Sequence, residues 1–260
     1  MIVDTHVHLS ALDAAEPVSA YIERAAQNGV TKMVSIGGDL DGNARSVLLA
    51  AEYPEQVYAS VGFDRDLAGA ELNYGLLDEQ VRAAGVVAVG ETGLDYHYGP
   101  DTREEQMALF GRMLDLAVEV QKPVVVHSRE ADEDTLDMLS TYASRVPALA
   151  GRPAVLHCFT GGVEFAQQLV ELGLFISFSG IVTFRNADAL REVAAVLPEE
   201  SIVIETDAPY LAPVPMRGKQ NEPAFVRHVA ECLADVRGCT VDYIAELTTR
   251  NAQRLFGWAG

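Results

Sequence analysis

The sequence predicts an α/β fold, specifically a (β/α)₈ TIM barrel with an extra helix near its C-terminal end. Apolar, β-branched segments alternate eight times with amphipathic segments, and the chain of 260 residues matches the roughly 250 residues of one such barrel. Short segments rich in Val and Ile are typical of parallel strands that are buried on both faces. We therefore expect a single domain over residues 1–260.

The eight expected strands cover residues 2–8, 32–37, 57–63, 86–91, 123–128, 154–159, 174–180 and 201–207. Helical patterns lie between them, and the clearest runs over 102–121, where apolar residues recur at three- and four-residue steps. Thr102 and Glu105 have the spacing of a capping box at its start. A further helical pattern over 241–258 follows the eighth unit, and we expect it to pack outside the barrel.

The chain is strongly acidic. Its 19 basic and 38 acidic residues give a net charge of −19. Because such a charge repels polyanions at long range, it argues against a broad nucleic-acid-binding surface. A nucleic acid substrate would be short or single-stranded and would be bound at its end.

Cysteine usage and hydropathy bear on the compartment. Cys158, Cys232 and Cys239 lack CxxC spacing, so we expect reduced thiols rather than a disulfide framework. The sequence shows neither a leader-like segment nor a run of 18 apolar residues. These features predict a cytoplasmic protein without membrane contact, and no stable protein partner is predicted.

Candidate metal ligands cluster where the expected strands end, which is the face on which such barrels place their chemistry. The six candidates are His6, His8, Glu91, His127, His157 and Asp207. Any one of these histidines alone is more often a satisfied polar residue than a ligand. Together they indicate bound metal, because burying four imidazoles and two carboxylates at one barrel mouth without partners would carry a large desolvation cost.

Alternation along the first strand places Asp4, His6 and His8 on one face, with Thr5 and Val7 toward the helices. Asp4 and Glu205 are candidates to hydrogen-bond a ligand histidine, since metal-bound imidazole usually donates its other N–H to a carboxylate. For Asp4, a buried hydrogen-bonding role without any link to a metal remains an equal alternative.

Six ligands are too many for one tetrahedral ion but suit two divalent ions that share a carboxylate. We expect His6, His8 and Asp207 to hold one ion and His127 and His157 to hold the other. Glu91 would bridge them. Zn²⁺, Mn²⁺ and Mg²⁺ all remain open. Asp207 is the candidate to orient the attacking water and to receive its proton.

The segments that carry these residues resemble a known family. DTHVHL, GETGLDY, VHSRE, LHCFTG, ETDAPYL and RGKQNEP look like the signature segments of the TatD-type metal-dependent hydrolases, often described as deoxyribonucleases, and they span residues 4–223 in family order. The resemblance implies an amidohydrolase-like barrel and the same six ligands. Phosphotriesterase-like relatives bridge their ions with a carboxylated Lys, whereas this chain has Glu91.

The resemblance implies 3′-to-5′ trimming of DNA or RNA as the favoured activity. A small phosphoester is a further possible substrate. The alternative is hydrolysis of a carboxylic ester or amide, including D-aminoacyl-tRNA deacylation, at the same site. A third alternative is a binding protein without activity, but the intact ligand set argues against it.

Substrate contacts are expected from Arg129, Arg217 and Lys219, which are basic residues that follow the fifth and eighth strands. An ion pair of Arg129 with neighbouring acids is an equal alternative. Tyr96 and His97 either line the pocket for a stacked base or form a structural loop.

Overall fold

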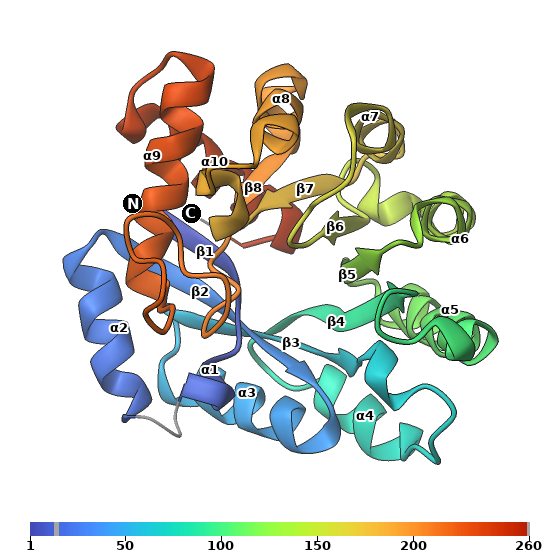
Figure 1. Ribbon diagram of the computed structural model, residues 1–260. Helices are drawn as coiled ribbons and strands as arrows, with labels where there is room; N and C mark the ends of the chain where they lie inside the picture. Colours follow the sequence, from blue (N-terminus) through green and yellow to red (C-terminus); the bar gives the residue numbers. More distant parts are fainter. Residues whose placement is uncertain (13–15, 259–260) are drawn as a thin grey trace.

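The computed structural model describes residues 1–12 and 16–258 and holds one eight-stranded parallel sheet in the order β1 to β8 (Figure 1). The strands are β1 (Ile2–Val7), β2 (Val30–Gly38), β3 (Val57–Phe63), β4 (Val86–Asp95), β5 (Val124–Arg129), β6 (Ala154–Leu156), β7 (Phe175–Phe178) and β8 (Ile202–Ile204). The sheet closes where Val7 and Ala208 form a parallel bridge. The backbone N–H of Asp207 also donates to the carbonyl oxygen of His6 at 2.9 Å. The prediction of a TIM-barrel fold is confirmed.

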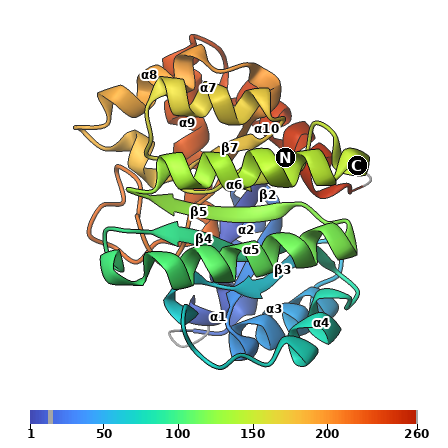
Figure 2. The same cartoon turned by 90° about the vertical axis from the view of Figure 1, so that its right-hand side faces the viewer.

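Helices surround the barrel, and Figure 2 shows α5 and α6 lying side by side over the strands that precede them. Each strand is followed by one outer helix, from α2 after β1 to α9 after β8. The helices are α1 (Leu9–Leu12), α2 (Val18–Gln27), α3 (Leu40–Glu52), α4 (Tyr74–Val81), α5 (Arg103–Val120), α6 (Asp132–Arg145), α7 (Val163–Glu171), α8 (Asp188–Val196), α9 (Val226–Arg237) and α10 (Val241–Phe256).

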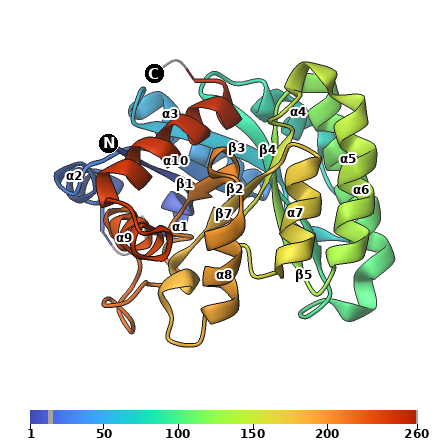
Figure 3. The same cartoon turned by 90° about the horizontal axis from the view of Figure 1, so that it is seen from above.

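The last helix, α10, closes the amino-terminal end of the barrel. Its Ala252, Leu255 and Phe256 form one apolar cluster with inward-facing residues near the amino ends of the strands, such as Val3 and Val125. The helix lies beside α9 in Figure 3. It therefore lies outside the ring of strands, as predicted, but acts as the floor of the barrel and leaves the carboxyl ends of the strands for the site.

Strand ends differ from the sequence-based expectation in two ways. β4 continues to Asp95, so Glu91 lies within the strand rather than at its end. β6 and β8 end at Leu156 and Ile204, so the polar residues expected at their ends lie in the segments that follow. The shortening has a local cause, because Cys158 and Asp207 adopt left-handed backbone conformations, with φ of 44° and 56°, that do not continue a strand.

Strict alternation along β1 is wrong. The pairing with β2 shifts register between Asp4 and Val7, as in a β-bulge. Thr5 Oγ1 lies 3.3 Å from Ser177 Oγ on β7, a strand that does not neighbour β1, so this contact crosses the barrel interior. Thr5 therefore points inward, not toward the helices. The bulge allows His6 to point inward as well.

The expected capping box of α5 is also wrong. Thr102 makes no side-chain cap to the helix, because a 3₁₀ turn over Pro100–Thr102 precedes it. Its Oγ1 instead donates to the carbonyl oxygen of Gly99 at 3.1 Å and accepts from Gln106 Nε2 at 3.0 Å.

Candidate metal centre

The first cluster brings together two imidazoles and two carboxylates at the carboxyl end of the barrel. His6 Nε2 and His8 Nε2 lie 3.3 Å apart. One residue, Val7, separates the two histidines, so both side chains can point toward the same side of the chain. Asp207 Oδ1 lies 3.6 and 3.4 Å from these two nitrogens. Glu91 Oε2 lies 3.4 and 3.7 Å from them. Four donor atoms from β1, the residue after it, β4 and the segment after β8 therefore converge.

These spacings fit a metal ion. Donor atoms about 2.0–2.2 Å from an ion at the centre of a tetrahedron lie about 3.3–3.6 Å from one another. The five distances in the first cluster run from 3.3 to 3.7 Å. An ion bound by both imidazoles would accept a lone pair from each of these two facing nitrogens.

The second cluster uses the other oxygen of Glu91. Glu91 Oε1 lies 3.1 Å from His157 Nε2 and 3.4 Å from His127 Nδ1. The two nitrogens are 3.3 Å apart. Glu91 thus faces the first cluster with Oε2 and the second with Oε1, which is the geometry a bridging carboxylate requires.

The cluster is buried, and its charges depend on one another. The exposed fractions are 0% for His6, 4% for Glu91 and 9% for Asp207. Burial alone would raise the pKa of Glu91, but the charge of His157 and hydrogen bonds from neighbouring imidazoles hold it well below its usual value. Burial lowers the pKa of His6, and the nearby His157 charge adds to this effect, so His6 is the neutral form that ligation needs.

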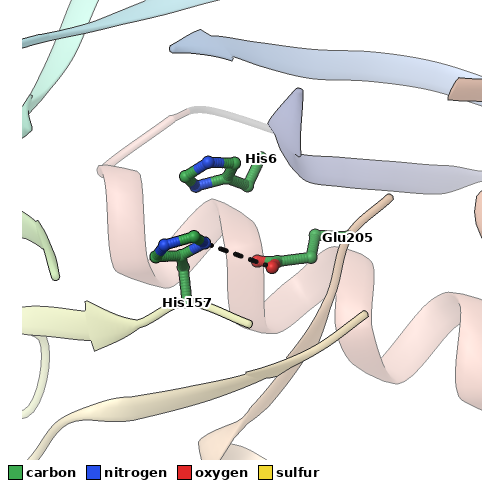
Figure 4. Close-up of side chains that lie close together, drawn as sticks. All are labelled: His6, His157 and Glu205. Carbon is green, nitrogen blue, oxygen red and sulfur yellow. Dashed lines mark ion pairs between the residues drawn. The ribbon is translucent and has the colours of Figure 1, made fainter. Parts of the chain in front are cut away.

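Two carboxylates orient the second-cluster histidines. Asp95 Oδ2 lies 3.1 Å from His127 Nε2, which leaves Nδ1 to face Glu91. Glu205 Oε1 lies 3.4 Å from His157 Nδ1, and Figure 4 shows the pair together with the ring of His6. The rings of His6 and His157 are stacked, with centroids 3.9 Å apart.

Glu205 is itself held in place. It accepts a hydrogen bond from the backbone N–H of Cys158 at 2.7 Å and another from the hydroxyl of Ser177. Glu205 therefore lies behind the imidazole of His157, one of the expected ligands, and its role in orienting a metal-bound ring stays a prediction.

Asp4 contacts backbone and hydroxyl groups instead of an imidazole. It accepts from the backbone N–H groups of Thr206 and His6 at 2.9 and 3.3 Å, and from Thr206 Oγ1 at 2.6 Å. Burial raises its pKa to about 8. Asp4 thus ties β1 to the segment that carries Asp207, which is the alternative that does not involve a metal.

Sequence reasoning missed Arg65, Asp64 and Asp95. Arg65 Nη1 donates to Glu91 Oε1 at 2.9 Å and to both oxygens of Asp64 at 2.6 Å. Asp64 and Arg65 directly follow β3, so the strand-end rule that found the histidines would also have found them. Asp95 lies four residues after Glu91 in β4, so alternation along a longer strand would have included it.

A cavity of about 750 Å³ opens above both clusters. Its lining includes Arg65, Arg129, Tyr98 and Tyr210. Tyr98 and Tyr210 are 73% and 57% exposed, so their rings are available to a ligand. The guanidinium carbon of Arg129 lies 4.6 Å from the centre of the Tyr98 ring.

The other expected substrate contacts lie elsewhere. Arg217 lies over the ring of Phe184 at 3.9 Å, and Lys219 is exposed. Neither of these two basic side chains lines the cavity that the described residues form. Tyr96 donates to Asp134 at 2.6 Å and His97 pairs with Glu130 at 2.7 Å, which is the structural-loop alternative.

A TIM barrel whose carboxyl-terminal mouth holds two carboxylate and histidine clusters defines the class of metal-dependent barrel hydrolases. Comparison with known proteins then identifies the family, since the sequence model described as "TatD related DNase" matches residues 3–257. The chain belongs to this family. The resemblance inferred from the sequence segments is confirmed, as is the expectation of a metal-dependent hydrolase.

Relatives share nearly the full length of the chain. The metal-dependent hydrolase YcfH of Escherichia coli (strain K12) is 41% identical over 258 residues, covering 98% of this chain and 95% of its own. The "3'-5' ssDNA/RNA exonuclease TatD" of Edwardsiella piscicida is 35% identical over 261 residues, covering 98% of each chain. The crystal structure of YjjV, a TatD homologue from Escherichia coli K12, has a TM-score of 0.86 and 32% identity, covering 99% of this chain and 98% of its own.

Within residues 1–12 and 16–258, no helix is long and apolar enough to cross a membrane. Relatives in Bacillus subtilis and Escherichia coli are named as metal-dependent hydrolases, and three groups of His, Asp and Glu side chains in this chain could hold a metal ion.

Proposed function

We propose that this protein is a two-metal phosphodiesterase that removes nucleotides from the 3′ end of short or single-stranded DNA or RNA. The observation that carries the proposal is the division of Glu91 between two clusters, with Oε2 facing His6 and His8 and Oε1 facing His127 and His157. The activity named for the Edwardsiella piscicida relative supports it.

The ligand sets follow from this geometry. His6, His8 and Asp207 with Glu91 would hold one divalent ion, and His127 and His157 with Glu91 would hold the other. An octahedral Mg²⁺ would place neighbouring ligands about 2.8–3.0 Å apart and prefers oxygen donors. The nitrogen-rich clusters, with spacings of 3.1–3.7 Å, favour Zn²⁺ or Mn²⁺.

Divalent ions held by these residues would supply Lewis-acid chemistry, polarising the phosphodiester and lowering the pKa of the attacking water. Asp207 positions that water and receives its proton at Oδ2, since Oδ1 faces the two imidazoles. Burial alone would raise the pKa of Asp207, but the hydrogen bond to His8 and the charge of His6 lower it overall. Asp207 is therefore ionised at neutral pH, which is the form that a proton acceptor must have.

The cavity walls suit the end of a single strand. Tyr98 and Tyr210 offer exposed rings on which bases stack, and Arg129 offers a planar cation to phosphate. Because the chain carries a net charge of −19, its affinity for nucleic acid comes from this local site rather than from the overall surface.

The three cysteines are free thiols, which supports a reducing compartment such as the cytoplasm.

The test combines metal analysis with a cleavage assay. Purified protein is analysed for bound metal and then incubated with a single-stranded oligonucleotide labelled at its 5′ end, with Zn²⁺, Mn²⁺ or Mg²⁺ added. We expect a ladder shortened stepwise from the 3′ end with wild type, and none with Asp207→Asn or with a 3′-blocked strand. Turnover of a carboxylic ester without any cleavage of nucleic acid would reject the proposal in favour of the alternative activity.

A further inference from the structure

Arg65 is a cationic side chain placed against the carboxylate that bridges the two clusters. It begins the 3₁₀ turn Arg65–Leu67 after β3, and its side chain is 18% exposed. Burial alone would lower its pKa, but the charges of Asp64 and Glu91 raise it, so the guanidinium stays charged. Its Nε is buried and has no hydrogen-bond partner within the described part of the chain.

Arg65 contacts only one of the two carboxylate oxygens of Glu91. Arg65 Nη1 donates to Glu91 Oε1 at 2.9 Å, and this is the oxygen that faces His157 Nε2 at 3.1 Å. The other oxygen, Oε2, faces the first cluster. The guanidinium therefore uses one of the two lone pairs of the oxygen that faces the second cluster, draws its negative charge away, and repels a cation there.

We propose that Arg65 competes with the ion of the second cluster for Glu91, so that the two metal positions fill in order, the His6 and His8 position first. This inference rests on the two-metal function proposed above. Asp64 makes the exchange possible, because both of its oxygens already lie 2.6 Å from Arg65 Nη1. The guanidinium can leave Glu91 and still keep an ionised partner.

The expected consequence is a difference in affinity between the positions. A single charge-assisted contact commonly corresponds to a factor of about ten or more in binding. We expect metal-free wild type to bind the second ion about tenfold or more weakly than the first. Arg65→Met should tighten the second binding event by a similar factor and leave the first nearly unchanged.

Two further variants make the test specific. Arg129→Met removes the same formal charge from the same cavity, but its guanidinium lies over Tyr98. The Arg129→Met variant should therefore keep the difference in affinity between the first and the second metal ion. The double variant Asp64→Asn/Arg65→Met removes the contact without leaving an unpaired carboxylate, so it keeps the test valid if the single variant is destabilised.

Calorimetric titration of the metal-free protein with Zn²⁺ gives both affinities. Titration with Mn²⁺ followed by electron paramagnetic resonance distinguishes protein that holds one ion from protein that holds two neighbouring ions. At one equivalent of Mn²⁺ we expect isolated ions in wild type and a larger share of spin-coupled pairs in Arg65→Met.

Equal affinities for the first and second ions in wild type would overturn the role of Arg65. So would an increase in affinity for the second ion in Arg129→Met as large as that in Arg65→Met. Either result would leave the two-metal function standing. Failure of wild type to bind two ions would overturn both.

Discussion

The Asp95→Asn substitution tests how the second metal position is built. Asp95 Oδ1 accepts the backbone N–H groups of His97 and Tyr98 at 3.0 and 2.8 Å, which fixes the orientation of the carboxylate. Oδ2 then faces His127 Nε2 at 3.1 Å. In the asparagine variant, Oδ1 keeps its two donors, so the amide NH₂ points at Nε2 and makes it an acceptor.

The proton of His127 must then sit on Nδ1, where it points toward Glu91 Oε1, 3.4 Å away, instead of offering a lone pair to an ion. Loss of such an orienting partner typically costs 10–100-fold in metal affinity, and the wrong tautomer should place this variant at about 100-fold, or about 2.8 kcal/mol. The first position should keep its affinity.

Calorimetric titration of the metal-free variant with Zn²⁺ measures both positions separately. Asp134→Asn is the matched control, because Asp134 anchors the same loop through Tyr96 without touching an imidazole. Unchanged affinity at the second position in Asp95→Asn, with an intact fold by circular dichroism, would refute the tautomer argument.

Three other predictions follow from the site and the barrel floor. Asp207→Asn should lower kcat for oligonucleotide cleavage by a factor of at least about 10², the lower range for a general base. A kcat within a factor of about three would remove Asp207 from that role. Tyr210→Ala should raise KM for a single-stranded oligonucleotide by about tenfold with little change in kcat, since stacking contributes about 1–3 kcal/mol per base. An equal effect on a substrate without a base would contradict stacking. Leu255→Ala, at a fully buried position of α10, should lower the free energy of unfolding in urea by about 2–5 kcal/mol and leave the kcat of the folded protein unchanged. A loss below about 1 kcal/mol would show that α10 is not an essential floor.

Much of the site could be read from residue order, and the reason is the geometry of parallel strands. Side chains at the carboxyl ends of consecutive strands meet at one mouth whatever separates them along the chain. His6, Glu91 and His157 therefore converge although they are far apart in sequence. The strand-end rule needed only the approximate position of each strand.

The errors lie where a local irregularity outweighs the pattern. Alternation placed Thr5 toward the helices, but the bulge in β1 turns it into the barrel. Arg217 and Lys219, expected from their position after β8 to contact substrate, do not line the cavity formed by the described residues, and their contact with substrate stays a prediction. Sequence offers no periodic signal for either event.

By itself, the amino-acid sequence determined the barrel, the family and the six candidate metal ligands that meet at its mouth, because periodicity and motif order can be read along the chain. Only the tertiary structure decided which oxygen of Glu91 faces which cluster, that Asp95 orients His127, and that Arg65 contacts the bridging carboxylate. These are contacts of a few ångströms between side chains on different strands. They depend on rotamers, bulges and the exact point at which each strand ends, and residue order alone does not specify these.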